Sequence, residues 1–454
     1  MNLKEFESYL DQNIHHFTEL SDRIWDYAEI MYKEYKSVEE QKSLLTNFGF
    51  KIYEIPDMET AFYAEYGDEG PIIGFLGEYD ALQGLSQIAD SFVKEENPKS
   101  SFGHGCGHNL IGAGSIAAAV AVKEYLIQNK QSGKVRYYGC PAEEGGSGKV
   151  YMIHRGVFDN VDVCLSWHPG SANVIFNNTL ANVHINLDFK GKKAHASANP
   201  TEGKSAYEGV EFANIGIAYL RGHLMPGARV DFAVSDAGGE APNIVPDFAS
   251  SNVLLRSPDL VDLKQMAGRI EDIAKGAAMM SGTTVDIEYG GACANFIPNS
   301  TLDDLMIQGM NKYLSNDFTN EELEYAKKYQ EVLGLSHMPQ PIMTQMLPMK
   351  TTPLGGSTDV ADISWVVPTA QVVIAAYALG SPMHNWVITA QGKSSIAHKA
   401  ILTAGKVLGS VAIDLFENLE LLEKVKEDYR NKLNGRSYES LIPSDQKPKS
   451  YRRD

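Results

Sequence analysis

The sequence is short of positive charge. Its 454 residues carry 40 Lys and Arg against 58 Asp and Glu, which gives a formal net charge of −18 at pH 7. A surface this acidic repels the phosphate backbone of nucleic acids and the headgroups of anionic membranes through its summed field. We therefore expect neither nucleic acid nor a membrane as a partner.

Long apolar runs and cysteines are also scarce. The apolar run 116–122 is much shorter than the roughly 18 residues that a membrane-spanning helix needs. The first residues, MNLKEFESYLDQ, are acidic where a signal peptide has a basic start followed by an apolar stretch. These features, and too few cysteines for a disulfide framework, predict a soluble, cytoplasmic protein. The cysteines are Cys106, Cys140, Cys164 and Cys293.

The chain has the composition of a folded protein, with 43% apolar and 22% charged residues. A short apolar run of strand character followed by polar residues occurs four times, and helical stretches such as 110–128 separate several of these runs. This alternation predicts an α/β domain with a mostly parallel sheet, in which sites lie beyond the carboxyl ends of the strands. The four runs are 72–76 before Glu78 and Asp80, 135–139 before Glu143 and Glu144, 161–165 before His168, and 372–376 before His384.

The pattern changes between residues 181 and 298. Apolar residues alternate along 183–189, and the following segments predict the β-α-β-β-α-β order of a ferredoxin-like domain. We expect this second domain, 181–298, to be inserted into a discontinuous first domain, 1–180 and 299–454. The expected segments are a helix at 205–224, strands at 229–234 and 249–256, a helix at 260–281 and a strand at 284–289. A helix with a long excursion is expected at 316–345, and a polar surface arm from residue 424.

The hexapeptide from His104 to Asn109, HGCGHN, is the densest chemical signal. A thiolate from Cys106 and an imidazole from His108, on a glycine loop before a helix, suit a divalent transition metal such as zinc. The hexapeptide alone is equally compatible with a glycine-rich turn that carries incidental histidines. A phosphate-binding loop is disfavoured because no Lys follows the glycines. Cys106 as a catalytic nucleophile is a rival interpretation.

Glu143 and Glu144 are adjacent acidic residues after a predicted strand. Neighbouring side chains of an extended segment diverge, so that one carboxylate can hold a metal while the other faces the attacking water. A solvated loop is the alternative, because Glu is usually exposed.

His168 and His384 follow apolar runs and precede turn residues. Each alone is more often a hydrogen-bonded, partly buried histidine than a metal ligand. Together with Cys106, His108 and Glu144 they form a plausible ligand set. Five ligands exceed the four of one tetrahedral zinc, so the set favours two metal ions that share a bridging group.

Asp80 lies two residues after Glu78, on the same side of an extended segment. It is placed to hydrogen-bond a metal-binding histidine from behind and so to fix the tautomer of the ring. Capping of the next helix is the alternative role.

The ordered motifs GEYDAL, HGCGHN, PAEEGG, SWHPG, GKKAHAS, APNIVPD and PMHNW resemble the M20 family of metallopeptidases, in its amidohydrolase branch. The resemblance covers nearly the whole chain. GSTDV at 356–360, followed by Trp365, is similar to a subgroup whose members are described as one of a pair of subunits. The chain departs from the branch at Leu76-Gly77-Glu78-Tyr79-Asp80, where Glu78 matches only loosely, and at Leu82-Gln83-Gly84.

The resemblance implies a role for each matching residue. Glu143 would be the general base and acid, and the inserted domain a lid through which two copies form a homodimer. His195 of the lid would stabilise the scissile carbonyl, often from the partner subunit, while Asn243 and Arg256 would lie near the carbonyl or carboxylate of the substrate. Two divalent ions, zinc or manganese with cobalt also possible, would be held by Cys106, His108, Glu144, His168 and His384.

The function expected from this site is metal-dependent hydrolysis of an amide bond next to a free carboxylate. The substrate would be an N-acyl amino acid, an aryl-amide of glutamate or a dipeptide. The alternative is a catalytically silent subunit, or one that requires a different partner chain. The sequence disfavours silence, because all of the expected catalytic positions are occupied.

Overall fold

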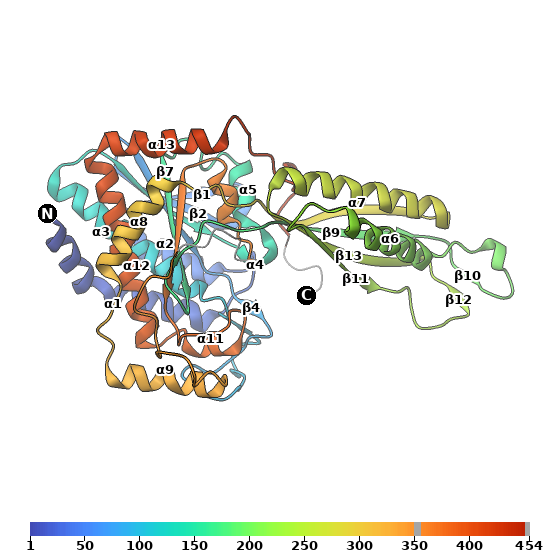
Figure 1. Cartoon of the computed structure of the whole chain (residues 1–454), viewed down its shortest axis with the longest axis horizontal. Coiled ribbons are helices and arrows are strands. Elements are labelled where there is room, and N and C mark those ends of the chain that lie inside the picture. Colours follow the sequence, from blue (N-terminus) through green and yellow to red (C-terminus); the bar gives the residue numbers. More distant parts are fainter. Residues whose placement is uncertain (349–355, 450–454) are drawn as a thin grey trace.

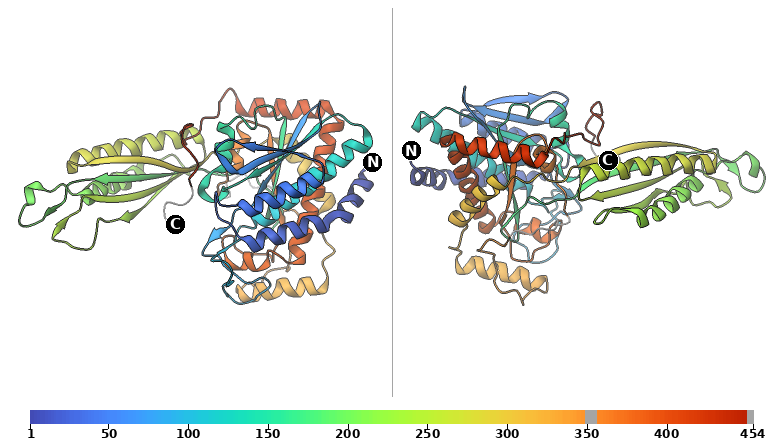
Figure 2. Two further views of the ribbon diagram at one scale, coloured as in Figure 1. Left: turned by 180° about the vertical axis from the view of Figure 1, so that it is seen from behind. Right: turned by 45° about the horizontal axis from the view of Figure 1, so that its top comes forward.

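The computed structural model describes residues 1–348 and 356–449, which form a larger α/β body and a smaller elongated body that projects from it (Figure 1). The views from behind and from above show the same projecting arm (Figure 2). The predicted α/β class is confirmed.

The larger body is built on a seven-stranded sheet with the order β1-β2-β6-β3-β7-β15-β8. The four strands β6, β3, β7 and β15 are parallel, whereas β1, β2 and β8 run antiparallel to their neighbours. The predicted mostly parallel sheet therefore describes the centre, and the edges depart from it. The strands are β1 (Lys51–Ile55), β2 (Met58–Tyr66), β3 (Ile72–Glu78), β6 (Lys134–Cys140), β7 (Val163–Gly170), β8 (Val174–Ile175) and β15 (Thr369–Ala375).

Helix α3 (His108–Asn129) runs through the core, between the sheet and the helices α1 (Leu3–Tyr27) and α12 (Ser395–Glu417). It is apolar on all sides because it is covered on all sides. By length and composition α3 could cross a membrane, but 89% of its most apolar window is buried within the structure, as in a core helix. The other helices of this body are α2 (Tyr35–Asn47), α4 (Glu143–Gly146), α5 (Gly148–His154), α8 (Ser300–Tyr313), α9 (Asn320–Val332), α10 (Val360–Ser364), α11 (Trp386–Gln391) and α13 (Leu419–Leu433).

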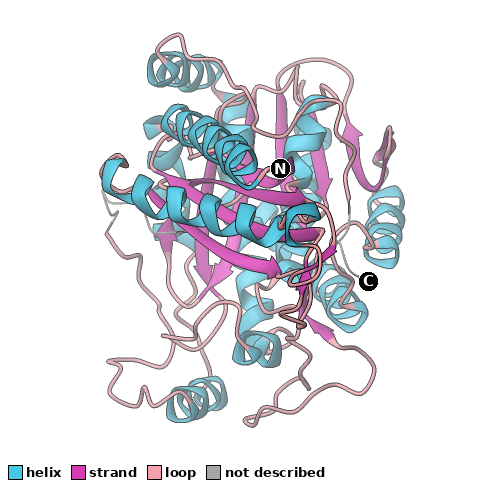
Figure 3. Cartoon of the chain, turned by 90° about the vertical axis from the view of Figure 1, so that its right-hand side faces the viewer, coloured by secondary structure: helices cyan, strands magenta, loops and turns pink. Residues whose placement is uncertain are grey.

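The projecting body is an antiparallel four-stranded sheet of order β11-β13-β9-β14, on which two helices pack. Seen end-on, the long helix lies across the strands (Figure 3). The inward side chains of β9 are fully buried and alternate with partly exposed ones, as the sequence predicts. The elements are β9 (Ala181–Lys190), α6 (Ala206–Leu220), β11 (Arg229–Asp236), β13 (Phe248–Ser257), α7 (Leu260–Ser281) and β14 (Thr284–Cys293), with the small strands β10 (Ala194–His195) and β12 (Ile244–Val245) at the far tip (Figure 1).

The C-terminal segment differs from the polar surface arm expected from residue 424. Residues up to Leu433 belong to α13, and the segment that follows packs over the junction of the two bodies. The Tyr438 hydroxyl donates to Asp362 Oδ1 at 2.8 Å, and Ile442 is only 2% exposed. Its few apolar side chains find partners at this junction, which a polar composition alone does not reveal.

Candidate metal centre and active site

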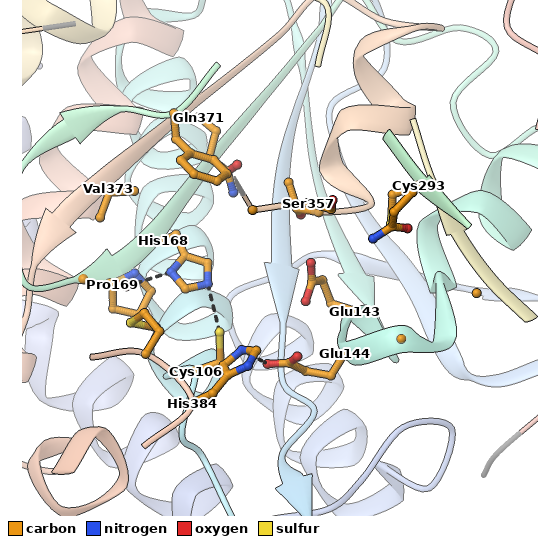
Figure 4. A pocket seen from close by; sticks show the side chains of 18 of the residues that line it. Cys106, Glu143, Glu144, His168, Pro169, Cys293, Ser357, Gln371, Val373 and His384 are labelled. Atoms are coloured by element: carbon orange, nitrogen blue, oxygen red, sulfur yellow. Dashed lines mark hydrogen bonds and ion pairs between the residues drawn. The ribbon is translucent and has the colours of Figure 1, made fainter. Parts of the chain in front are cut away.

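The carboxyl ends of the central strands open onto one cavity of about 820 Å³. Its volume is within the usual range for small-molecule sites. Five predicted residues line this cavity and face one another in Figure 4. They are Cys106, Glu143, Glu144, His168 and His384.

The loops that carry these residues have backbone conformations that the sequence must accommodate. Gly107 has a φ of +76°, and a Cβ on it would lie 2.1 Å from the Tyr377 hydroxyl, so only glycine fits between Cys106 and His108. Ala142 and His384 are non-glycine residues with φ of 57° and 56°. Such strained positions are sustained only where the surrounding structure holds them, as it does at functional sites.

His108 is fully buried and held from behind. Its Nδ1 lies 2.8 Å from Asp80 Oδ1, which assigns the ring proton to Nδ1 and leaves Nε2 as an unprotonated donor atom. Nε2 has no hydrogen-bond partner within the described part of the chain. The other oxygen of Asp80 accepts the backbone N–H of Glu144 at 2.9 Å, which ties the two motifs together.

The remaining donor atoms gather around Cys106. Its Sγ lies 3.5 Å from His168 Nε2, and His384 Nε2 lies 3.2 Å from Glu144 Oε1. The Nδ1–H of His168 points at the Pro169 carbonyl at 2.7 Å, so that Nε2 faces the sulfur. Two groups, Cys106 with His108 and His168, and Cys106 with Glu144 and His384, have all their donor atoms within 4.8 Å. Sulfur, imidazole and carboxylate donors at this spacing fit a divalent ion such as zinc.

The electrostatics also suit a cation. Burial and the nearby His108 lower the pKa of His168 to about 4, which keeps this ring neutral and able to bind metal. Burial and Glu144 raise the pKa of the Cys106 thiol well above its usual value. Without a cation Cys106 is therefore protonated, which disfavours the rival interpretation of a thiolate nucleophile.

Glu143 and Glu144 point in different directions (Figure 4). Glu144 faces His384, while Glu143 extends into the cavity. Burial and the neighbouring carboxylates of Glu78 and Glu144 raise the pKa of Glu143 well above its usual value. A carboxyl group with a raised pKa is suited to accepting and returning a proton near neutral pH.

The structure separates the three predicted lid residues. Arg256 lines the cavity, where its Nη1 donates to Ser357 Oγ at 3.1 Å. His195 and Asn243 are exposed on and beside β10 and β12, at the far tip, and do not line the cavity. Backbone N–H groups of Ser197 and Ala198 donate to His195 Nδ1, which assigns the proton of the neutral ring to Nε2.

Sequence reasoning missed several residues beside the site. Lys149 is fully buried and lies 2.6 Å from Glu78 and 2.5 Å from Asp359. No local pattern marks a buried lysine, because lysine is almost always exposed. Asn182 and His184 line the cavity next to Arg256, and only their outward positions in the alternating pattern of β9 signalled them.

A family model described as peptidase family M20/M25/M40 matches residues 74–385. The chain belongs to this family. It is 36% identical to one of the two named subunits of the p-aminobenzoyl-glutamate hydrolase of Escherichia coli, over 98% of the chain and 99% of that protein. It is 29% identical to the Xaa-Arg dipeptidase of Mus musculus over 93% and 91% of the two chains. The predicted family and enzyme class, a hydrolase of amide bonds, are confirmed.

Solved structures support the same fold. The aminobenzoyl-glutamate utilization protein of Klebsiella pneumoniae matches with a TM-score of 0.63 at 18% identity, covering 90% of this chain and 98% of that one. A dinuclear metal-binding M20 peptidase of Bacillus subtilis matches with a TM-score of 0.58 at 17% identity, covering 91% and 99%.

Replacement of the candidate thiolate ligand tests the metal centre. We predict that Cys106→Ser loses bound metal, because a hydroxyl is a much weaker ligand than the thiolate that a divalent ion stabilises. Metal content per chain, measured by inorganic mass spectrometry after gel filtration, checks this. Cys164→Ser, at a buried cysteine outside the donor groups, is the matched control and keeps its metal. Unchanged occupancy in Cys106→Ser contradicts the assignment.

Proposed function

We propose that this protein is a two-metal amidohydrolase that cleaves an amide bond next to a free carboxylate. The observation that carries the proposal is the pair of buried donor atoms His108 Nε2 and Glu144 Oε1. They lie 4.0 Å apart and have no hydrogen-bond partner in the described residues. Buried polar atoms without partners are costly, and two ions would satisfy them. The ligands would be Cys106, His108, Glu144, His168 and His384, with zinc or manganese, or cobalt, as the metal.

The residues of the chain then divide the work of hydrolysis. When bound, the ions polarise the amide carbonyl and acidify water. Glu143 removes a proton from the attacking water as its oxygen bonds to the carbonyl carbon, and delivers that proton to the nitrogen as the C–N bond breaks. Asp80 keeps the His108 ring in the tautomer that presents Nε2.

The cavity favours a substrate with a carboxylate. Arg256 is the only lysine or arginine among the described residues that line it, and a planar guanidinium pairs a carboxylate with two hydrogen bonds. The proposed substrates are N-acyl amino acids, aryl-amides of glutamate such as p-aminobenzoyl-glutamate, and dipeptides. Relatives of this chain are named for substrates of these classes.

The projecting body, residues 181–298, is proposed to be a lid that joins two copies of the chain. His195 and Asn243 are exposed at its tip rather than at the cavity of their own chain, so they are proposed to complete the site of the partner. His195, with its proton on Nε2, is suited to donate to the developing oxyanion.

A different partner chain is the second candidate. The relative from Escherichia coli is named as one of two kinds of subunit in its hydrolase, and the other kind is itself 28% identical over 51% of this chain. The cysteines lie within the described residues and are all free and buried, which supports a reducing, cytoplasmic setting.

The proposed function is tested with a mixed panel of substrates. We predict that metal-loaded protein hydrolyses one class among p-aminobenzoyl-glutamate, N-acyl amino acids, indole-acetyl-amino acids and dipeptides, and that metal-stripped protein hydrolyses none. Mass spectrometry of the products checks both samples in parallel. Equal cleavage in both points to a thiol mechanism, and no cleavage in either refutes a self-sufficient enzyme.

The role of Glu143 has its own signature. Glu143→Ala is expected to lower kcat by about 10²–10⁴-fold, because the proton carrier is lost, while both metal ions stay bound. Steady-state kinetics together with metal analysis of the same sample measure the two effects. Retained turnover removes Glu143 from the mechanism.

Complementation tests whether His195 acts in the partner's site. Glu143→Ala and His195→Ala chains are each expected to be inactive alone. Randomly reassociated, they should recover roughly a quarter of wild-type activity, because half of the dimers are mixed and each mixed dimer has one intact site. Gel filtration confirms the dimers. Mixed dimers without activity show that His195 does not act across the interface.

A further inference from the structure

Glu78 ends β3 beside the candidate metal centre, and it is not among the five candidate ligands. Its side chain lies in the interior, and the residue is 1% exposed. One oxygen, Oε1, lies 2.6 Å from the Lys149 ammonium. The other, Oε2, lies 3.5 Å from His108 Nε2 and has no hydrogen-bond partner among the residues the structure describes. A buried carboxylate oxygen in this state requires an explanation, because its desolvation is uncompensated.

Lys149 and Asp359 hold Glu78 in this orientation. The Lys149 ammonium contacts Glu78 on one side and Asp359 Oδ1, at 2.5 Å, on the other. The backbone N–H of Lys149 also donates to Asp359 Oδ2 at 3.0 Å. The ammonium is thus fixed by two carboxylates, and its contact with Oε1 aims Oε2 at the imidazole.

The spacing of the two free atoms fits a shared ion. Two ligands on one tetrahedral ion, at about 2.1 Å each, lie about 3.4 Å apart. Glu78 Oε2 and His108 Nε2 are separated by 3.5 Å, the same distance as Cys106 Sγ and His168 Nε2. Glu78, His108 and Glu143 also form a third group whose donor atoms lie within 4.8 Å of one another.

The number of ligands points the same way. A catalytic zinc ion typically has three protein ligands and one open position, and the set of five candidate ligands is one short of three for each of two ions. We propose that Glu78, through Oε2, is a further ligand of the ion that His108 Nε2 holds, and that Lys149 and Asp359 are the positioning residues that aim it. This inference rests on the proposed two-metal function.

Substitution of Glu78 by glutamine tests the inference. Glu78→Gln keeps the size of the side chain and an oxygen that accepts from Lys149, but removes the anionic oxygen that faces His108. We expect the variant to retain one ion per chain where the wild type retains two, and the dissociation constant of the weaker ion to rise at least about 10–100-fold, the loss typical of a supporting group at a metal site. Metal content and competition with a chromogenic chelator measure this without turnover.

Glu34→Gln is the matched control. Glu34 is also fully buried, with one oxygen accepting the backbone N–H of Ala142 at 2.9 Å and the other without a hydrogen-bond partner in the described chain. It belongs to none of the donor groups. The same change there should leave two ions bound with wild-type affinity.

The outcomes separate the inference from the proposed function. A wild-type chain that binds no pair of ions refutes the function itself. A wild-type chain that binds two, with Glu78→Gln equally tight, overturns only the inference and leaves Glu78 as the counter-ion of Lys149. Circular dichroism checks that each variant folds. If Glu78→Gln does not fold, Glu78→Asp decides, because it keeps the charge opposite Lys149 while withdrawing the oxygen from His108. Unchanged affinity there also overturns the inference.

Discussion

The hydrogen bond between Asp80 and His108 is the constraint on which the site depends. It fixes the imidazole inside the protein with Nε2 as a free donor atom, and the second oxygen of Asp80 fixes the backbone of Glu144. One carboxylate therefore sets the orientation of two candidate ligands from different strands. The parallel centre of the sheet makes this possible, because it brings the ends of β3 and β6 and the start of α3 to the same edge.

Charge at this edge is balanced within the fold. Glu78, Glu143, Glu144 and Asp359 are carboxylates close to one another, and Lys149 is the buried cation among them. Burying this many anions without further positive charge is unfavourable. A pair of divalent ions would supply that charge, and Arg256 adds a cation on the side of the cavity where a substrate carboxylate would lie. The site is thus arranged for cations on one side and an anionic substrate group on the other.

The two bodies of the chain divide stability from function. The larger body buries α3 and the central sheet in an extensive core that holds the candidate ligands rigidly. The projecting body brings Arg256, Asn182 and His184 to the cavity at its base, while its tip carries His195 and Asn243 away from it. This arrangement explains why the proposed function includes a second copy of the chain.

The sequence by itself determined the family, the α/β class, the order of the elements and the residue types of the donor set. Strands with alternating or continuous apolar residues, and short motifs with fixed spacing, are local features. Only the tertiary structure decided that Lys149 and Glu78 meet beside His108, that Arg256 reaches the cavity, and that His195 does not. These are contacts between segments far apart in the chain, and their energies depend on burial and on distance, which no local pattern contains. A buried lysine and an exposed one are the same letter until the fold surrounds one of them.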